Sequence, residues 1–343
     1  MIDETILTGL AELADAADTH AVWPERSWQS LANAGVLRHS IPRDLGGDER
    51  VAADALDQNR RLAGACLTTA FVLSQREAAV RRLLASHRTD LRREYLPRAA
   101  SGEWFLTVGL SQLTTSRQHR APSLVAETDG DGYRIEGEIP WVTGASVAQA
   151  IVVGATLPDD SQILFLLPKG HAGVRIDPPM ELSSLKGSLT SSVRCEGVRI
   201  DAKLLLGGPT VRILGVSGGG GLETSCLALG LASAAIDWLA EQGRERTEAA
   251  AAAAKLGAVR ERLTNDLHRL SREPSPVDAV LKFRADCSLL AIRTTQVALI
   301  VAKGNGFVAP HPAQRWARQA LFFLVWSCPR SVSDGLLGEL LSD

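Results

Sequence analysis

The chain has 343 residues, 45% of them hydrophobic, and a formal net charge of −2 at pH 7. This length suits two or three packed units around a sizeable core. The near-neutral charge lacks the basic excess that nucleic-acid-binding proteins usually show. We therefore expect a soluble globular protein that does not bind nucleic acid.

The sequence also argues against a membrane protein or a secreted protein. The N-terminal segment is acidic and amphipathic, without the basic and apolar regions of a signal peptide. No run of about 18 or more apolar residues occurs, so no membrane span is expected. The five cysteines are scattered without a CxxC pair, which fits reduced thiols better than disulfides or a zinc site. The sequence predicts a cytoplasmic protein with no metal and no membrane contact.

Residues 1–100 have the pattern of a helical domain. Leu7, Leu10 and Leu13 follow helical spacing, and Pro and paired Gly break the pattern at residues 41–47. One long helical stretch is predicted over residues 52–85.

The pattern changes to short strands over residues 101–207, which predicts a central β domain. Apolar runs there are bounded by Pro, Gly or Asp. The Asp-Gly-Asp-Gly turn at residues 129–132 predicts a hairpin. Trp141 and Thr143 follow it, and their alternation along a strand predicts that both side chains face the same side.

Residues 208–343 return to helical pattern and predict a four-helix bundle. Helices are expected at residues 222–239, 249–270, 277–302 and 312–325. The glycine run at residues 218–221 favours a linker and helix start over a phosphate loop, because no Lys-Ser/Thr follows it.

Two motifs connect this layout to a known family. A strand, a Ser/Thr-rich loop, a hairpin and Gly-x-x-x-Trp-Val-Thr-Gly-Ala occur in that order. Near the C-terminus, Lys-Gly-Asn-Gly-Phe precedes Pro-x-x-Arg. Both resemble the acyl-CoA dehydrogenase family. The resemblance implies an α+β multidomain fold with an N-terminal helical domain (1–100), a central β-barrel-like domain (101–207) and a C-terminal four-helix bundle (208–343).

The resemblance also implies FAD as the cofactor and names residues that would bind it. By position, these are Ser111, Ser116, Trp141, Thr143, Gly304 and Gly306. In the family, the glycine turn approaches the FAD of a neighbouring subunit, so a homodimer or homotetramer is expected. From the residues alone, Trp141 could instead plug a junction between sheet and helix, and the glycines could end a helix.

The catalytic base is the main departure from the family. Dehydrogenation of an acyl thioester needs a carboxylate to remove the α-proton. Counting from Arg318 places Ser327 at the position where most of the family has Glu. Glu223 is the only acid at the start of the bundle, and it is the candidate replacement. Its alternative role is a first-turn charge that favours the helix N-terminus.

The resulting hypothesis is a flavin oxidoreductase that takes hydride from an acyl-thioester-like or other small-molecule substrate to flavin N5. Two alternatives stay open. One is a flavin-dependent oxidase or monooxygenase acting on a heteroatom or aromatic substrate, which needs no acid at Ser327. The other is a catalytically silent homologue.

Overall fold

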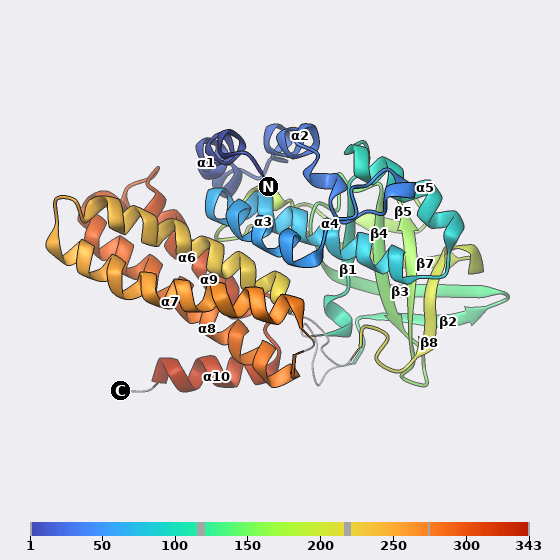
Figure 1. Ribbon diagram of the computed structural model, residues 1–343. Helices are drawn as coiled ribbons and strands as arrows, with labels where there is room; N and C mark the ends of the chain where they lie inside the picture. The colour runs from blue at the N-terminus through green and yellow to red at the C-terminus, as the bar shows by residue number, and fades with distance from the viewer. Residues whose placement is uncertain (1, 115–120, 216–220, 274, 342–343) are drawn as a thin grey trace.

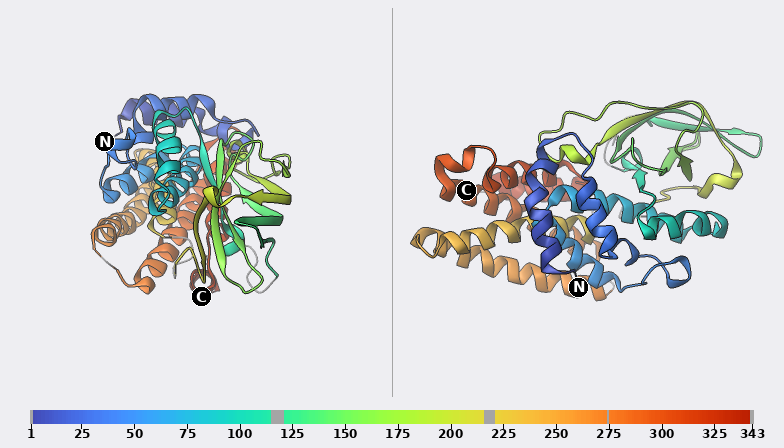
Figure 2. Two further views of the ribbon diagram at one scale, coloured as in Figure 1. Left: turned by 90° about the vertical axis from the view of Figure 1, so that its right-hand side faces the viewer. Right: turned by 90° about the horizontal axis from the view of Figure 1, so that it is seen from above.

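The computed structural model describes residues 2–114, 121–215, 221–273 and 275–341. N-terminal helices come first, a single sheet follows, and C-terminal helices complete the chain (Figure 1). This order confirms the fold predicted from the sequence. Figure 2 shows the sheet on one side of the molecule and the long helices on the other.

Five α-helices form the N-terminal part: α1 Glu4–Thr19, α2 Glu25–Asn33, α3 Ala52–Ala65, α4 Leu67–Ala85 and α5 Thr89–Ser101. The stretch predicted as one helix over residues 52–85 is two helices. The break lies at Cys66, whose backbone is extended with φ −150°. Helix α4 packs on strands β1 and β4 and on helix α6, so it lies between the sheet and the bundle.

The sheet has eight strands: β1 Leu106–Gly109, β2 Leu124–Asp129, β3 Gly132–Val142, β4 Ala150–Thr156, β5 Gln162–Pro168, β6 Val174–Ile176, β7 Ser191–Ile200 and β8 Leu205–Thr210. Their order is β6-β7-β3-β2-β4-β5-β8, and β1 pairs in parallel with β4. The β2–β3 hairpin turns at Gly130, where φ is +65°. Strand β8 continues to Thr210, past the predicted domain end at residue 207.

The C-terminal helices are α6 Leu222–Gln242, α7 Thr247–Arg272, α8 Val277–Ala302, α9 Pro312–Val325 and α10 Arg330–Leu341. The first four lie where the sequence predicts them. Helix α10 is an addition, and its Val332 and Leu336 pack on Leu289 of α8. Two glycines and several polar residues dilute its apolar pattern, which explains why periodicity does not predict it.

Two bundle segments, Leu222–Gln242 and Val277–Phe307, are long and apolar enough to cross a membrane. In the fold, 67% and 61% of their most apolar windows are buried. They are therefore core helices of the bundle. Their apolar character comes from contacts on most sides, because a helix surrounded by others has no polar face.

A close helix crossing fixes the bundle against the N-terminal helices. A Cβ placed on Gly230 of α6 would lie 2.1 Å from the carbonyl oxygen of Arg60 on α3. A Cβ on Gly64 of α3 would lie 3.1 Å from the Gly230 carbonyl oxygen. Glycine at position 230 is thus required by the contact between two backbones.

The end of α9 is held by a buried arginine on α8. Arg284 is fully buried and donates to the carbonyl oxygens of Phe323 (3.2 Å) and Trp326 (3.1 Å) and to the Ser288 hydroxyl (2.7 Å). Burial lowers the pKa of Arg284 to about 10. These bonds satisfy carbonyl groups that the end of a helix leaves open, and they fix the direction of the chain after α9.

We predict that Arg284→Met lowers the free energy of unfolding by about 2–4 kcal/mol, because it leaves buried carbonyl oxygens unpaired. Denaturant unfolding followed by circular dichroism measures the change. Arg272→Met, at an exposed position near the end of α7, is the matched control and should have little effect. Equal stability of the two variants would contradict the role of Arg284.

Candidate functional site

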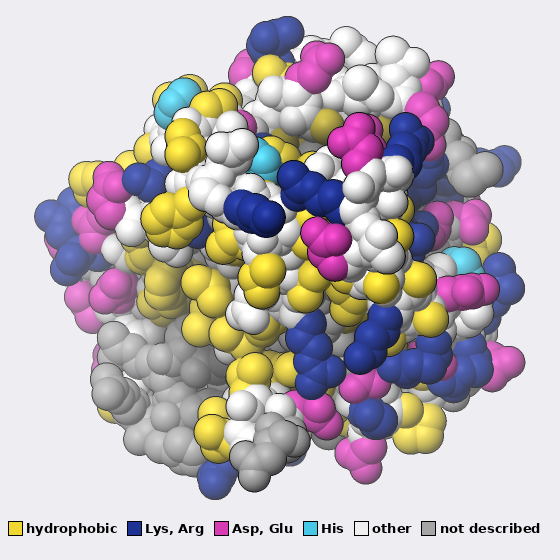
Figure 3. Space-filling view, turned by 90° about the vertical axis from the view of Figure 1, so that its left-hand side faces the viewer, with side chains coloured by type: hydrophobic (Ala, Val, Ile, Leu, Met, Phe, Trp, Pro, Cys, Tyr) yellow, Lys and Arg dark blue, Asp and Glu magenta, His cyan; other side chains and the backbone are white. Residues whose placement is uncertain are grey.

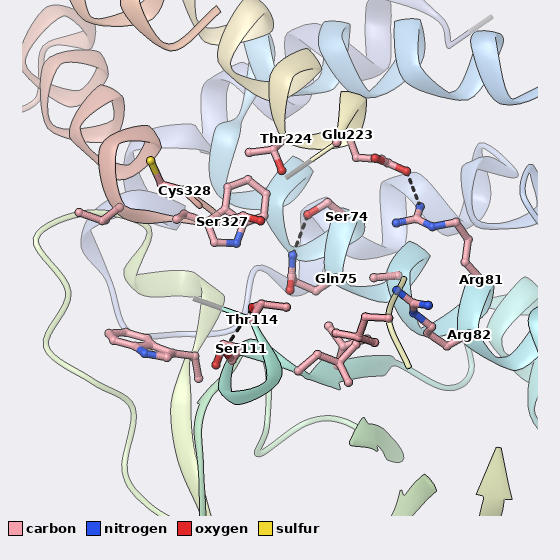
Figure 4. A pocket seen from close by; sticks show the side chains of 18 of the residues that line it. Ser74, Gln75, Arg81, Arg82, Ser111, Thr114, Glu223, Thr224, Ser327 and Cys328 are labelled. Atoms are coloured by element: carbon pink, nitrogen blue, oxygen red, sulfur yellow. Dashed lines mark hydrogen bonds and ion pairs between the residues drawn. The ribbon is translucent and has the colours of Figure 1, made fainter. Parts of the chain in front are cut away.

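A cavity of about 970 Å³ lies where the sheet, α4 and the bundle meet. Its walls come from α4, from the loop after β1, from the end of β3, from the start of α6 and from the segment that joins α9 to α10. Figure 4 shows side chains from these elements pointing toward one another across the space. A cavity of this size is large enough for a cofactor or a drug-sized ligand.

The sheet side of the cavity contains Ser111 and Trp141. Ser111 begins a short 3₁₀ helix, Ser111–Leu113, and its buried Oγ has no hydrogen-bond partner among the described residues. Trp141 lies near the end of β3 with 48% of its surface exposed. An unpartnered hydroxyl and an uncovered ring are both ready to contact a ligand.

Thr143 is not among the described residues that line the cavity. Strand β3 ends at Val142, and its pairing with β7 shifts between Ile139 and Val142. The strand alternation therefore does not extend to Thr143. This residue is buried, and its hydroxyl lies 3.3 Å from that of Thr190. Its contact with a flavin stays a prediction.

The other predicted cofactor residues are Ser116, Gly304 and Gly306. Ser116 is outside the described residues. Gly304 and Gly306 lie in the 3₁₀ helix Lys303–Phe307 that follows α8, away from the cavity lining. The left-handed residue that ends α8 is Lys303, with φ +56°. Gly306 is buried against α8 and α9, and the contact of this turn with a second subunit stays a prediction.

Glu223 lines the cavity and is the only carboxylate among the described lining residues. It lies in the first turn of α6, and 40% of its side chain is exposed. Its carboxylate forms an ion pair with Arg81 of α4 at 3.5 Å (Figure 4). Glu223 is thus held at the rim between α4 and α6.

The wall of the cavity across from Glu223 and Arg81 is formed by the end of α9 and the segment that joins it to α10 (Figure 4). Trp326 stacks on Phe322 with ring centroids 4.9 Å apart, and Phe71 of α4 packs edge-on against both. Ser327 follows with a left-handed backbone, φ +48°, and its side chain lines the cavity beside Cys328. Burial raises the pKa of the Cys328 thiol, so this thiol is a weak nucleophile at neutral pH.

Several lining residues were not singled out from the sequence. The most notable are Arg81 and Arg82 of α4 and the aromatic pair Phe322 and Trp326. Two adjacent arginines in a helix that is otherwise largely buried were a usable signal. Phe322 and Trp326 gave no such signal in the sequence, because aromatic residues at helical spacing are usually core residues.

The residues present fit a flavin. The Ser111 Oγ is a buried polar atom without a partner among the described residues, and Ser111 lines the cavity together with the half-exposed Trp141. A hydroxyl can bond the polar edge of the ring system, and an indole can cover its flat face. In the described residues no group of three His, Cys, Asp or Glu side chains gathers to hold a metal ion.

Comparison with known proteins gives consistent matches. Residues 1–103 match the family described as "Acyl-CoA dehydrogenase, N-terminal domain". The chain is 23% identical over 343 residues to "Probable acyl-CoA dehydrogenase YngJ" of Bacillus subtilis, covering 93% of this chain and 90% of the relative.

Solved structures extend the likeness to the whole fold. Butyryl-CoA dehydrogenase from Megasphaera elsdenii superposes with a TM-score of 0.85 at 18% identity, covering 98% of this chain and 97% of the other. The prolyl acyl carrier protein oxidase AnaB superposes with a TM-score of 0.84 at 15% identity, covering 99% and 98%.

We predict that Ser111→Ala weakens FAD binding about two- to tenfold, the usual range for one lost hydrogen bond. Stability should change little, because the hydroxyl has no hydrogen-bond partner within the part of the chain that the structure describes. Titration of FAD followed by tryptophan fluorescence measures the affinity, and Ser101→Ala, at an exposed position on α5, is the control.

The same titration on Thr143→Val decides the predicted contact of Thr143. Affinity falls if its hydroxyl reaches the flavin and is kept if Thr190 retains the hydroxyl. Unchanged FAD affinity in Ser111→Ala would contradict the placement of the ring.

Proposed function

Because this chain belongs to the acyl-CoA dehydrogenase family, we propose that it is an FAD-dependent oxidoreductase taking hydride from an acyl-thioester-like substrate. The observation that carries the proposal is the cavity between sheet and bundle, with the unpartnered Ser111 hydroxyl on its wall. The fold alone does not select the reaction, because one fold hosts several chemistries.

Different residues of the cavity would hold the flavin and the substrate. When bound, FAD supplies the hydride acceptor. Ser111 holds the polar edge of the ring system, and Trp141 covers part of its face. Phe322 and Trp326 form an apolar wall on the bundle side that excludes water from the substrate.

Glu223 is the proposed base for a substrate with an acidic C–H bond. Two observations support this role: it is the only carboxylate among the described lining residues, and Arg81 fixes its position. The guanidinium of Arg81 forms an ion pair with the Glu223 carboxylate. A proton taken from the substrate must therefore compete with Arg81 for an oxygen of this carboxylate. Ser327 cannot substitute, since an unassisted hydroxyl does not remove such a proton at neutral pH.

We predict that Glu223→Gln slows reduction of the flavin by an acyl-CoA substrate by about a hundredfold or more, the usual loss for a general base. Stopped-flow measurement of the visible flavin absorbance under anaerobic conditions gives the rate. Glu241→Gln, an exposed acid at the other end of α6, is the control, and flavin content should stay the same in both variants.

An unchanged rate in Glu223→Gln would contradict the assignment of the base. It would favour the second candidate function, a flavin-dependent oxidase or monooxygenase. The serine at position 327 and the ion pair of Glu223 are the observations that keep this candidate open, and the likeness to an acyl carrier protein oxidase agrees with it. Fast reaction of the reduced flavin with oxygen would distinguish the oxidase or monooxygenase from a dehydrogenase.

We also propose that the protein is a cytoplasmic homodimer or homotetramer. Support comes from apolar side chains at the end of α8, where Ile300 is 73% exposed, Phe307 82% and Val308 65%. Figure 3 views the molecule from this end of the bundle, and hydrophobic side chains gather near the middle of that face. Exposed apolar groups of this kind commonly mark a protein interface.

We predict that the flavin-loaded protein sediments as a dimer or tetramer at micromolar concentration. Phe307→Ser should shift it toward the monomer, because the substitution removes an apolar contact, whereas Val22→Ser, at an exposed valine near α1, should not. A wild-type monomer that retains bound flavin in analytical ultracentrifugation would contradict this assembly.

A further inference from the structure

The rim of the cavity contains two adjacent arginines, Arg81 and Arg82, near the C-terminal end of α4. In Figure 4 their guanidinium groups lie on the side of Glu223, across the space from Ser327 and Cys328. Both are part of the cavity lining although neighbouring residues on a helix point about 100° apart. Arg81 is also exposed to solvent and Arg82 is half-buried, so the charge lies where the cavity opens to water.

The two arginines differ in how their charge is compensated. Arg81 has the carboxylate of Glu223 at 3.5 Å. Arg82 is half-buried, and no hydrogen bond or ion pair joins its guanidinium to another described residue. Burial lowers the pKa of Arg82, the charge of Arg81 lowers it further, and Glu223 opposes both effects. The rim thus has two cations and one anion.

Two fully buried arginines of this chain show how a guanidinium is compensated away from water, whereas Arg82 is only half-buried. Arg76 pairs with Glu77 and donates to the carbonyl oxygens of Leu37 and Ala99. Arg284 donates to two carbonyl oxygens and a hydroxyl. Removing a guanidinium from water without such partners is unfavourable. At a cavity rim, the missing partner can be supplied by a ligand.

We propose that Arg82 binds an oxyanion of the substrate, a phosphate or a carboxylate, with Arg81 adding long-range attraction. A guanidinium offers a planar set of donors that matches both groups. This assignment rests on the proposed function only in placing the substrate in the same cavity as the flavin. It narrows the substrate class to anionic compounds: thioesters with a phosphate on the pantetheine arm, or with a carboxylate on the acyl group.

Two matched probe pairs distinguish these sources. 4′-Phosphopantetheine and pantetheine differ only in the phosphate. Succinyl-pantetheine and butyryl-pantetheine have acyl chains of equal length and differ in the terminal carboxylate. Binding of each is measured by isothermal titration calorimetry, and the preference is the affinity of the anionic probe over its neutral counterpart.

We expect wild-type protein to prefer one of the anionic probes by about tenfold or more, the range of a charge-assisted hydrogen bond. Arg82→Gln should abolish the preference, Arg82→Lys should keep part of it, and Arg93→Gln, an exposed arginine on α5, should leave it intact. The pair that shows the preference identifies the source of the anion.

Two results would overturn the proposal: no anionic preference in the wild type, or an unchanged preference in Arg82→Gln. Loss of FAD from Arg82→Gln together with an unchanged preference would assign the guanidinium to the phosphates of the cofactor. Because the titration needs no turnover, an Arg82-dependent preference in a protein that oxidises no thioester would disprove the proposed function and leave this inference standing.

Discussion

The buried charge of Arg284 is the constraint on which the shape of the site depends. Among the described residues, no acid forms an ion pair with its guanidinium, which donates to the carbonyl oxygens of Phe323 and Trp326 and to the Ser288 hydroxyl. A buried charge depends on such hydrogen bonds, so the end of α9 has little freedom. With α9 ended there, Trp326 stacks on Phe322 and Ser327 turns into the cavity. One wall of the site is therefore a consequence of a single core interaction.

The other walls of the cavity are positioned by different contacts, and each wall contributes a different kind of side chain. The crossing of α3 and α6 at Gly230 brings the start of the bundle beside α4, and the pair of Glu223 with Arg81 joins these two elements at the rim. The sheet contributes polar and aromatic groups, the end of α9 contributes apolar rings, and α4 contributes charge. The polar and aromatic wall suits a flavin ring, while the charged rim suits the polar end of a substrate.

Much of the fold was predictable from the sequence because its signals are local. Apolar periodicity places the first four bundle helices, and the Asp-Gly pairs at residues 129–132 place the hairpin. The break at Cys66 was not predictable, since an extended residue between two good helix formers leaves no mark in periodicity. In the site, the resemblance named Trp141 and Ser111, which line the cavity. The register shift before Val142 depends on pairing with a distant strand, so the sequence alone does not show where Thr143 lies. The role of Arg82 depends on a missing partner, which no sequence displays.

In the proposed arrangement, the cavity between sheet and bundle holds FAD. The most direct measurement is the visible absorption spectrum of the protein after incubation with FAD and separation from free cofactor by gel filtration. We expect a yellow protein with about one flavin per chain and tryptophan fluorescence quenched by the ring beside Trp141. A colourless protein, with all FAD in the small-molecule fractions and unchanged tryptophan fluorescence, would contradict it.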